Sequence, residues 1–105
     1  MLERDIERIL VSEVRKVGGK AYKWVSPGNA GVPDRIVIFP GKTPVFVELK
    51  TDGGSLTKLQ EARIRELERL GQTVYLARGI GGVRRLFELM GHERVSESLE
   101  SRYGS

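Results

Sequence analysis

Apolar side chains recur with a helical period in three parts of the chain. Over residues 2–17 they lie three and four positions apart, which predicts an amphipathic helix that a pair of glycines ends. A second amphipathic and highly charged segment runs to about Leu70, with Ser55 or Thr57 as its candidate N-cap. A third, shorter helix is predicted after Gly82 from the spacing of four apolar residues, Val83, Leu86, Phe87 and Met90.

Between these helices the pattern changes to alternation or to runs of β-branched and aromatic residues, which are typical of strands. The four predicted strands are residues 20–25, 34–39, 44–50 and 72–77. The second and third form a hairpin, and the strand–helix–strand passage over residues 48–77 favours parallel pairing through a right-handed crossover. The order helix, strand, strand, strand, helix, strand, helix therefore predicts an α/β fold with a mixed sheet flanked by helices.

Length and composition fit one soluble globular domain. The chain has 105 residues, of which 39% are hydrophobic and 30% charged, which is enough for a single modest core. We assign this domain to residues 1–91. The polar residues 92–105 are expected to form a C-terminal tail that frays or packs loosely.

Charge and residue composition limit the cellular locations and the kinds of partner that are expected. No apolar run approaches the roughly 20 residues that span a bilayer, and the charged N-terminus is unlike a signal peptide, so no membrane partner is expected. The lack of cysteine excludes disulfides and thiolate metal sites and is compatible with the cytoplasm. The net charge of +4 and the pI near 9.7 favour a polyanionic partner such as nucleic acid.

Three polar residues of the predicted hairpin are expected to share one face. If the turn is centred on Lys42, antiparallel pairing sets Asp34 opposite Lys50 and Ile36 opposite Glu48. Directly opposed residues share a face, so Asp34, Glu48 and Lys50 form one polar cluster. The strand neighbours on the other face, which we expect in the core, are Val45, Val47 and Leu49.

Such a cluster has the groups that metal-assisted phosphodiester hydrolysis needs. Two carboxylates and the backbone carbonyl of Leu49 form an oxygen-rich site for a hard cation such as Mg²⁺. Lys50 could orient or deprotonate the attacking water, or neutralise the transition-state charge. Glu7 could add a carboxylate if the first helix packs across the hairpin, and Gln60 could face the cluster. By itself, a Glu-x-Lys pattern also fits an ion pair on a solvent-exposed strand face. Glu7 also fits a solvated acid of its helix.

The segment before Asp34 has features of a nucleic-acid contact. A glycine-rich polar loop over residues 26–31 leads into Pro33, whose rigid backbone fixes the start of the strand. The residues predicted to contact a DNA backbone are Lys23, Ser26, Arg35 and Lys58. The alternative is a plain connecting loop.

Several motifs, taken in order, resemble one family. Asp34, Glu48 and Lys50 match the PD-(D/E)xK nuclease motif, and residues 3–90 more specifically resemble the stand-alone VRR-NUC (virus-type replication-repair nuclease) proteins. The segments that carry the resemblance are Glu3, Ile6-Glu7, Leu10-Val11, Gly18-Gly19, Tyr22-Lys23, Ser26-Pro27-Gly28, Gly31-Val32-Pro33-Asp34-Arg35, Phe46-Val47-Glu48-Leu49-Lys50 and Gln60.

The resemblance implies a restriction-endonuclease-like core and a metal-dependent endonuclease for branched DNA, which as a homodimer cuts four-way (Holliday) junctions. By the same resemblance, Asp34 and Glu48 would bind Mg²⁺ or Mn²⁺ and Lys50 would serve the attacking water. Gln60 would support the site. Glu7 matches the first-helix glutamate of resolvase-like enzymes, and Glu3 is the competing choice.

Two other functions remain open at this point. One is a non-catalytic nucleic-acid-binding module with the same fold. The other is a nuclease that acts on flaps or nicked duplex rather than on junctions. Whether the nuclease cuts junctions or flaps, the resemblance implies that it acts in the cytoplasm of a bacterial or phage-infected cell.

Overall fold

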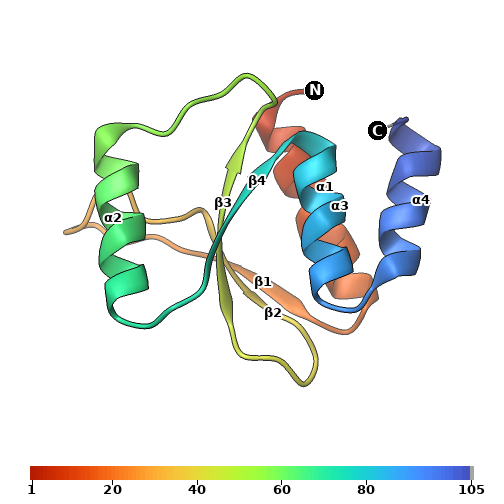
Figure 1. Cartoon of the computed structure of the whole chain (residues 1–105), viewed down its shortest axis with the longest axis horizontal. Coiled ribbons are helices and arrows are strands. Elements are labelled where there is room, and N and C mark those ends of the chain that lie inside the picture. Colours follow the sequence, from red (N-terminus) through yellow and green to blue (C-terminus); the bar gives the residue numbers. More distant parts are fainter. Residues whose placement is uncertain (105) are drawn as a thin grey trace.

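A four-stranded mixed sheet separates the helices into two groups (Figure 1). The computed structural model describes residues 1–104. Its elements in order are α1 (Glu3–Lys16), β1 (Lys20–Lys23), β2 (Arg35–Ile38), β3 (Val45–Lys50), α2 (Lys58–Arg69), β4 (Val74–Arg78), α3 (Gly79–Leu89) and α4 (Glu93–Tyr103). The predicted α/β fold with a mixed sheet is confirmed.

Strand pairing follows the predicted topology with a different register in the hairpin. The sheet order is β1-β2-β3-β4, with antiparallel pairs at β1–β2 and β2–β3 and a parallel pair at β3–β4. Ile36 pairs with Phe46 rather than with Glu48, so the predicted register was wrong by two residues. The turn is therefore centred on Gly41, whose positive φ of 71° suits a glycine. A shift of two residues keeps every side chain on its face, and the polar cluster survives.

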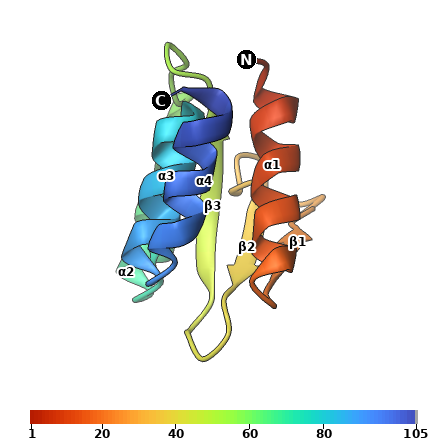
Figure 2. The same cartoon turned by 90° about the vertical axis from the view of Figure 1, so that its right-hand side faces the viewer.

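One face of the sheet carries the hydrophobic core. In Figure 2, α1, α3 and α4 lie on the near side of the strands and α2 lies behind them. Val45, Val47 and Leu49 of β3 are buried on this near face, as predicted. They join residues of the other elements, namely Ile6, Leu10 and Val14 from α1, Val37 from β2, Ala77 from β4, and Val83, Leu86 and Phe87 from α3.

The opposite face of the sheet is only partly covered. The rings of Trp24 and Phe46 lie 5.2 Å apart there, tilted at 46°. Phe46 and Glu48 are two residues apart on β3 and so share this face. Helix α2, on the same side, has no fully buried residue. Glu48 is thus reached from α2 rather than from the core.

The expectation of a loose tail after Gly91 is wrong. The chain forms α4 there, and Leu99 is wholly buried beside the core. Arg102 of α4 lies 3.0 Å from Oε2 of Glu13, a buried acid of α1, and Lys16 lies 2.9 Å from the same atom. Burial alone raises the pKa of Glu13, but the hydrogen bonds from Lys16 and Arg102 outweigh it and leave that pKa lowered. The polar segment therefore contains one buried apolar side chain, Leu99, and one arginine, Arg102, that pairs with the buried Glu13 of α1.

Helix α3 begins at Gly79, four residues before the predicted start at Val83. Gly79 adopts a positive φ of 60° at its first position. A Cβ on Gly82 would lie 2.8 Å from a backbone carbon of Ala77, so this glycine lets the helix lie close against the end of β4. The hydroxyl of Tyr75 donates a hydrogen bond to the carbonyl of Gly82 at 2.8 Å. Gly79, Gly81 and Gly82, which precede the predicted helix, therefore belong to the observed one.

No helix within residues 1–104 has the length and apolar character that crossing a membrane requires.

We expect Leu99→Ala to lower the free energy of unfolding by about 2–5 kcal/mol, because it removes a wholly buried side chain. Urea unfolding would measure the change. Ser101→Ala on the exposed side of the same helix should alter it by less than about 0.5 kcal/mol. Equal stability of Leu99→Ala and the unsubstituted protein would show that α4 is not part of the folded unit.

Candidate active site

Asp34 is tied to the neighbouring strand by a backbone hydrogen bond. It directly precedes β2 and follows Pro33, which is buried. Its Oδ2 accepts a hydrogen bond from the backbone N–H of Leu49 at 2.8 Å. The carboxylate of one strand is therefore fixed against the next strand, one residue from Glu48.

Glu48 and Lys50 form a close pair on β3. The Nζ of Lys50 lies 3.5 Å from Oε2 of Glu48. Glu48 is 1% exposed, and the side chain of Lys50 is 12% exposed. Because Asp34 is held beside Leu49, the three polar residues of the hairpin converge, and we call Asp34, Glu48 and Lys50 the carboxylate–lysine cluster.

Gln60 joins this cluster to the start of α2. Its Nε2 donates a hydrogen bond to Oε2 of Glu48 at 3.1 Å, and its Oε1 accepts one from the backbone N–H of Thr57 at 2.9 Å. Thr57 in turn caps the helix, since its Oγ1 accepts from the N–H of Gln60 at 3.1 Å. Thr57, rather than Ser55, is thus the N-cap. The same glutamine completes the helix cap and orients Glu48.

Burial and the negative charge of a neighbouring acid raise the pKa values of both carboxyl groups. Burial is the largest cause for Glu48, followed by the negative charge of Asp34; together they raise its pKa to about 7 although Lys50 opposes them. For Asp34, burial again raises the pKa, the hydrogen bond from Leu49 lowers it, and the charge of Glu7 raises it further. The cluster therefore holds more negative charge than Lys50 neutralises.

This donor set fits a hard divalent cation. Oδ1 of Asp34 and Oε1 of Glu48 make no hydrogen bond within residues 1–104, and no described side-chain oxygen is both buried and unbonded, so both keep contact with solvent. Mg²⁺ needs only one or two protein carboxylates and completes its shell with water and phosphate oxygens. Leu49, whose carbonyl is the third candidate ligand, directly follows Glu48, and its backbone N–H binds Asp34. A cation here would neutralise the charge that raises both pKa values.

Helix α1 brings two further acids within electrostatic range of the cluster. Oε2 of Glu7 accepts from Nε of Arg35 at 2.7 Å and lies 3.8 Å from Nζ of Lys23. Glu7 acts electrostatically on Asp34, and Glu3 acts on Glu48. Within residues 1–104 no three acidic or histidine side chains converge as a metal site. Which of the two glutamates serves the reaction stays a prediction.

Two of the four predicted DNA contacts, Lys23 and Arg35, lie opposite each other on β1 and β2, whereas Ser26 lies in the loop after β1 and Lys58 begins α2. Lys23 is exposed, whereas Arg35 is mostly enclosed and also donates a hydrogen bond to the carbonyl of Ala21 at 3.3 Å. Ser26 accepts from Asn29 at 3.1 Å, beside a small pocket that Trp24 and Arg63 help to line. Lys58 is exposed at the first position of α2. Their contact with DNA stays a prediction.

Two features of the site were missed in the sequence. The Arg35–Glu7 pair links residues 28 apart and has no local pattern that would reveal it. The arginines on the outer face of α1 had a readable signal, because Arg4, Arg8 and Arg15 recur at steps of four and seven. That spacing places them on one side of the helix.

A mixed sheet with Asp and Glu-x-Lys on its central hairpin, and with a helix glutamine bound to the glutamate, is the arrangement of the PD-(D/E)xK nuclease class. Within that class, the VRR-NUC domain model matches residues 3–80. The chain belongs to the VRR-NUC family. The match ends inside α3, so α4 lies beyond it.

Known relatives agree with this assignment. A protein of Acyrthosiphon pisum secondary endosymbiont phage 1, named "Putative nuclease p44", is 51% identical over 72 residues, which cover 69% of this chain and 77% of that protein. Two solved structures named "VRR_NUC domain" and "VRR_NUC domain protein" share the fold. The first has a TM-score of 0.76 at 24% identity and covers 82% of this chain and 94% of its own. The second has a TM-score of 0.69 at 20% identity, with coverage of 84% and 86%.

We expect Glu48→Gln to stabilise the metal-free protein at pH 8 by on the order of 2 kcal/mol and to have much less effect at pH 5. The pKa of Glu48 is about 7 in the folded protein and ordinarily 4.5. The folded state therefore holds the proton more tightly, and this contribution to stability is lost as the pH rises through 7.

Urea unfolding at several pH values in EDTA would measure this difference. Glu61→Gln, on the exposed face of α2, should leave the pH dependence of the unsubstituted protein unchanged. Stability curves that stay parallel for Glu48→Gln and the unsubstituted protein from pH 5 to 8 would contradict the account.

Proposed function

We propose that this protein is a metal-dependent, structure-selective DNA endonuclease that hydrolyses phosphodiester bonds of four-way junctions. The observation that carries the proposal is the convergence of a buried carboxylate, Glu48, and a half-buried one, Asp34, whose pKa values are both raised, with Lys50 on one sheet face. Such a charge imbalance is costly in a purely structural site and useful in a metal site. Membership of the VRR-NUC family supports a nuclease.

Asp34, Glu48 and the carbonyl of Leu49 would hold Mg²⁺ or Mn²⁺. When bound, the ion supplies charge stabilisation at the phosphate and a lower pKa for a bound water. The hydrogen bond from Leu49 to Oδ2 of Asp34 leaves Oδ1 for the ion. Gln60 does the same for Glu48, since it binds Oε2 and leaves Oε1 available.

Lys50 would act on the attacking water. Its Nζ is close to Glu48, where a water bound beside the carboxylates would lie within reach. Enclosure of its side chain reduces the solvent that would otherwise screen its charge, so the ammonium would also stabilise the developing charge of the transition state. Glu7 or Glu3 would tune the site from α1 through their charges.

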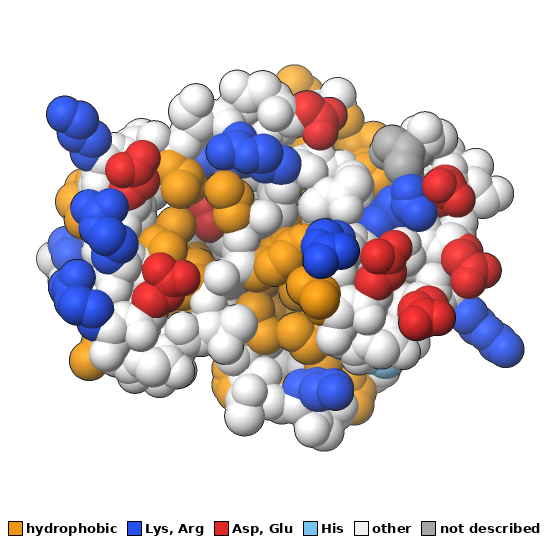
Figure 3. Space-filling view, viewed as in Figure 1, with side chains coloured by type: hydrophobic (Ala, Val, Ile, Leu, Met, Phe, Trp, Pro, Cys, Tyr) orange, Lys and Arg blue, Asp and Glu red, His pale blue; other side chains and the backbone are white. Residues whose placement is uncertain are grey.

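A homodimer fits this activity, because paired cuts across a junction call for two sites related by a two-fold axis. Figure 3 shows apolar side chains gathered between α2 and α3. Strand β4 is an edge of the sheet there, with half-buried Val74, Tyr75 and Leu76, and Leu70 at the end of α2 is 69% exposed. This apolar surface supports a second copy as its cover. A single-chain mass by light scattering at micromolar concentration would refute the dimer.

The preference for junctions has the narrowest support, which is the resemblance to stand-alone VRR-NUC proteins. The phage origin of the nuclease-named relative supports action inside an infected bacterial cell. The junction preference and the cellular location both rest on similarity to other proteins, and neither alters the chemistry proposed for the carboxylate–lysine cluster.

A cleavage assay with Mg²⁺ or Mn²⁺ tests the proposal. We expect metal-dependent cutting of a four-way junction in preference to a flap, linear duplex or supercoiled plasmid. Glu48→Ala should reduce the single-turnover rate by at least about 10³-fold and Lys50→Ala by about 10²-fold or more. Lys42→Ala, in the exposed hairpin turn, should cut at the unsubstituted rate.

Different failures would overturn different parts of the proposal. Absence of metal-dependent cleavage of all four substrates would refute the nuclease. Preferential cutting of flaps would refute only the junction preference. Full activity of Lys50→Ala would refute the role given to the lysine.

A further inference from the structure

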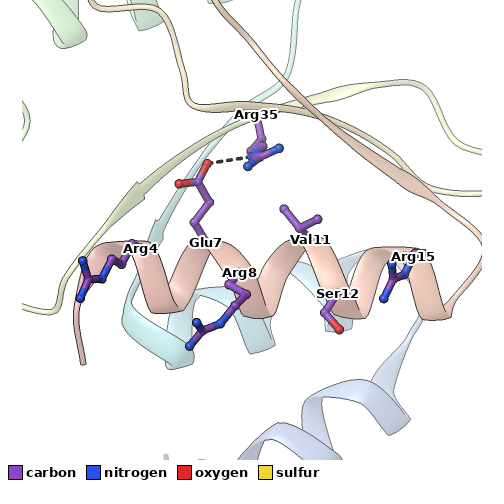
Figure 4. A pocket seen from close by; sticks show the side chains of 7 residues that line it. All are labelled: Arg4, Glu7, Arg8, Val11, Ser12, Arg15 and Arg35. Atoms are coloured by element: carbon purple, nitrogen blue, oxygen red, sulfur yellow. Dashed lines mark hydrogen bonds and ion pairs between the residues drawn. The ribbon is translucent and has the colours of Figure 1, made fainter.

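An open groove of about 380 Å³ runs along the outer face of α1, outside the carboxylate–lysine cluster (Figure 4). It is lined by Arg4, Glu7, Arg8, Val11, Ser12, Arg15 and Arg35. Four of these seven side chains are arginines and one is an acid. The only lining residue with an apolar side chain is Val11, and the charged lining residues carry excess positive charge.

The arginines differ in how they are held. Arg35 is fixed by Glu7 at 2.7 Å, and Arg8 is paired with Asp5 at 2.9 Å. The side chains of Arg4 and Arg15 make no ion pair or hydrogen bond with any other residue of the described chain, 1–104, and both residues are exposed. Figure 4 shows them toward opposite ends of the groove, with Glu7 and Arg35 meeting between them. Two guanidinium groups are thus available to an external anion.

The dimensions suit an extended anion. Arg4 and Arg15 are eleven residues apart on α1, which corresponds to about 16 Å along the helix axis. A nucleic-acid strand advances roughly 3.4 Å along its axis per phosphate, so that length matches several successive phosphates. The groove also lies near the cluster, because the charge of Glu7, one of its lining residues, acts on Asp34.

We propose that this groove binds the sugar-phosphate backbone of the DNA substrate beyond the cleavage point, with Arg4 and Arg15 as its principal phosphate contacts. The inference rests on the proposed nuclease function and assigns a surface to it. Arg35 and Glu7 would form a fixed wall between the groove and the cluster. The free arginines would hold the substrate arm in position without contact with the reacting atoms.

The lining argues against other occupants. A helical peptide in a groove needs several apolar anchors, and only Val11 is present. A small phosphorylated molecule needs an enclosed pocket with convergent donors, whereas Arg4 and Arg15 are exposed and far apart along the helix. A polyanion whose charges repeat along its length satisfies both arginines at once.

The test compares two variants that each remove two positive charges. Arg4→Gln/Arg15→Gln changes the groove. Arg69→Gln/Arg94→Gln is the matched control, because these arginines are exposed on α2 and α4 and form no ion pair within residues 1–104. Binding of a fluorescent four-way junction is measured by anisotropy, with Mg²⁺ present and Asp34→Asn added to every protein to prevent cleavage. The salt concentration is varied from about 50 to 200 mM.

For the groove variant we expect several-fold weaker binding and a slope of log K against log salt lower by about 1.8, since each lost phosphate contact removes about 0.9. The control should stay within twofold of its parent. In the active background, the groove variant should cut at the parental single-turnover rate once the protein saturates the DNA. Melting temperatures should be equal for all proteins, because the substituted side chains are exposed.

Equal losses in the groove and control variants would overturn the inference, because they would show a response to net charge alone. Unchanged binding by the groove variant would overturn it too, and would leave the groove to another ligand such as an acidic protein surface. Either result alongside metal-dependent cleavage by the unsubstituted protein leaves the proposed function intact. If the unsubstituted protein neither binds nor cuts DNA, both fail together.

Discussion

The hydrogen bond from the backbone N–H of Leu49 to Oδ2 of Asp34 is the interaction on which the candidate site depends. It holds Asp34 against the strand that carries Glu48 and Lys50. Two carboxylates are therefore close together where solvent access is low. Burial and repulsion raise the pKa of Glu48 to about 7, and Lys50 offsets only part of this. The folded chain thus carries an electrostatic strain that a bound cation would relieve.

The rest of the structure supports that arrangement from two directions. On one side the buried residues of β3 fix the strand to α1 and α3, which prevents the acids from moving apart. On the other side Gln60 connects Glu48 to the cap of α2, so the start of that helix and the orientation of the glutamate depend on each other. Helix α4 lies beyond the family match and is joined to α1 by the ion pair between exposed Arg102 and buried Glu13. The same α1 presents Glu7 to the site and its arginines to solvent.

The sequence predicted every element except α4, together with the sheet topology and the polar cluster, because periodicity and strand alternation are local properties. The hairpin register was wrong by two residues, yet the cluster survived since side-chain direction repeats every two positions. Contacts between residues far apart in the chain could not be predicted from the sequence. Arg35 binds Glu7 across 28 residues, and Arg102 binds Glu13 across most of the chain, and neither pair has a signature in its own segment. Helix α4 was missed for that reason, because its one wholly buried apolar side chain, Leu99, sits among charged neighbours.

Direct binding of a metal ion is the most immediate test of the central claim, that the carboxylate–lysine cluster is a divalent cation site. Calorimetric titration of Mn²⁺ at pH 8 would compare the unsubstituted protein with Asp34→Asn and with Asp52→Asn, an exposed aspartate in the turn after β3. The account predicts saturable binding to the unsubstituted protein and to Asp52→Asn, with an affinity at least about tenfold lower for Asp34→Asn. Equal Mn²⁺ affinity in all three proteins, or no binding to any of them, would contradict it.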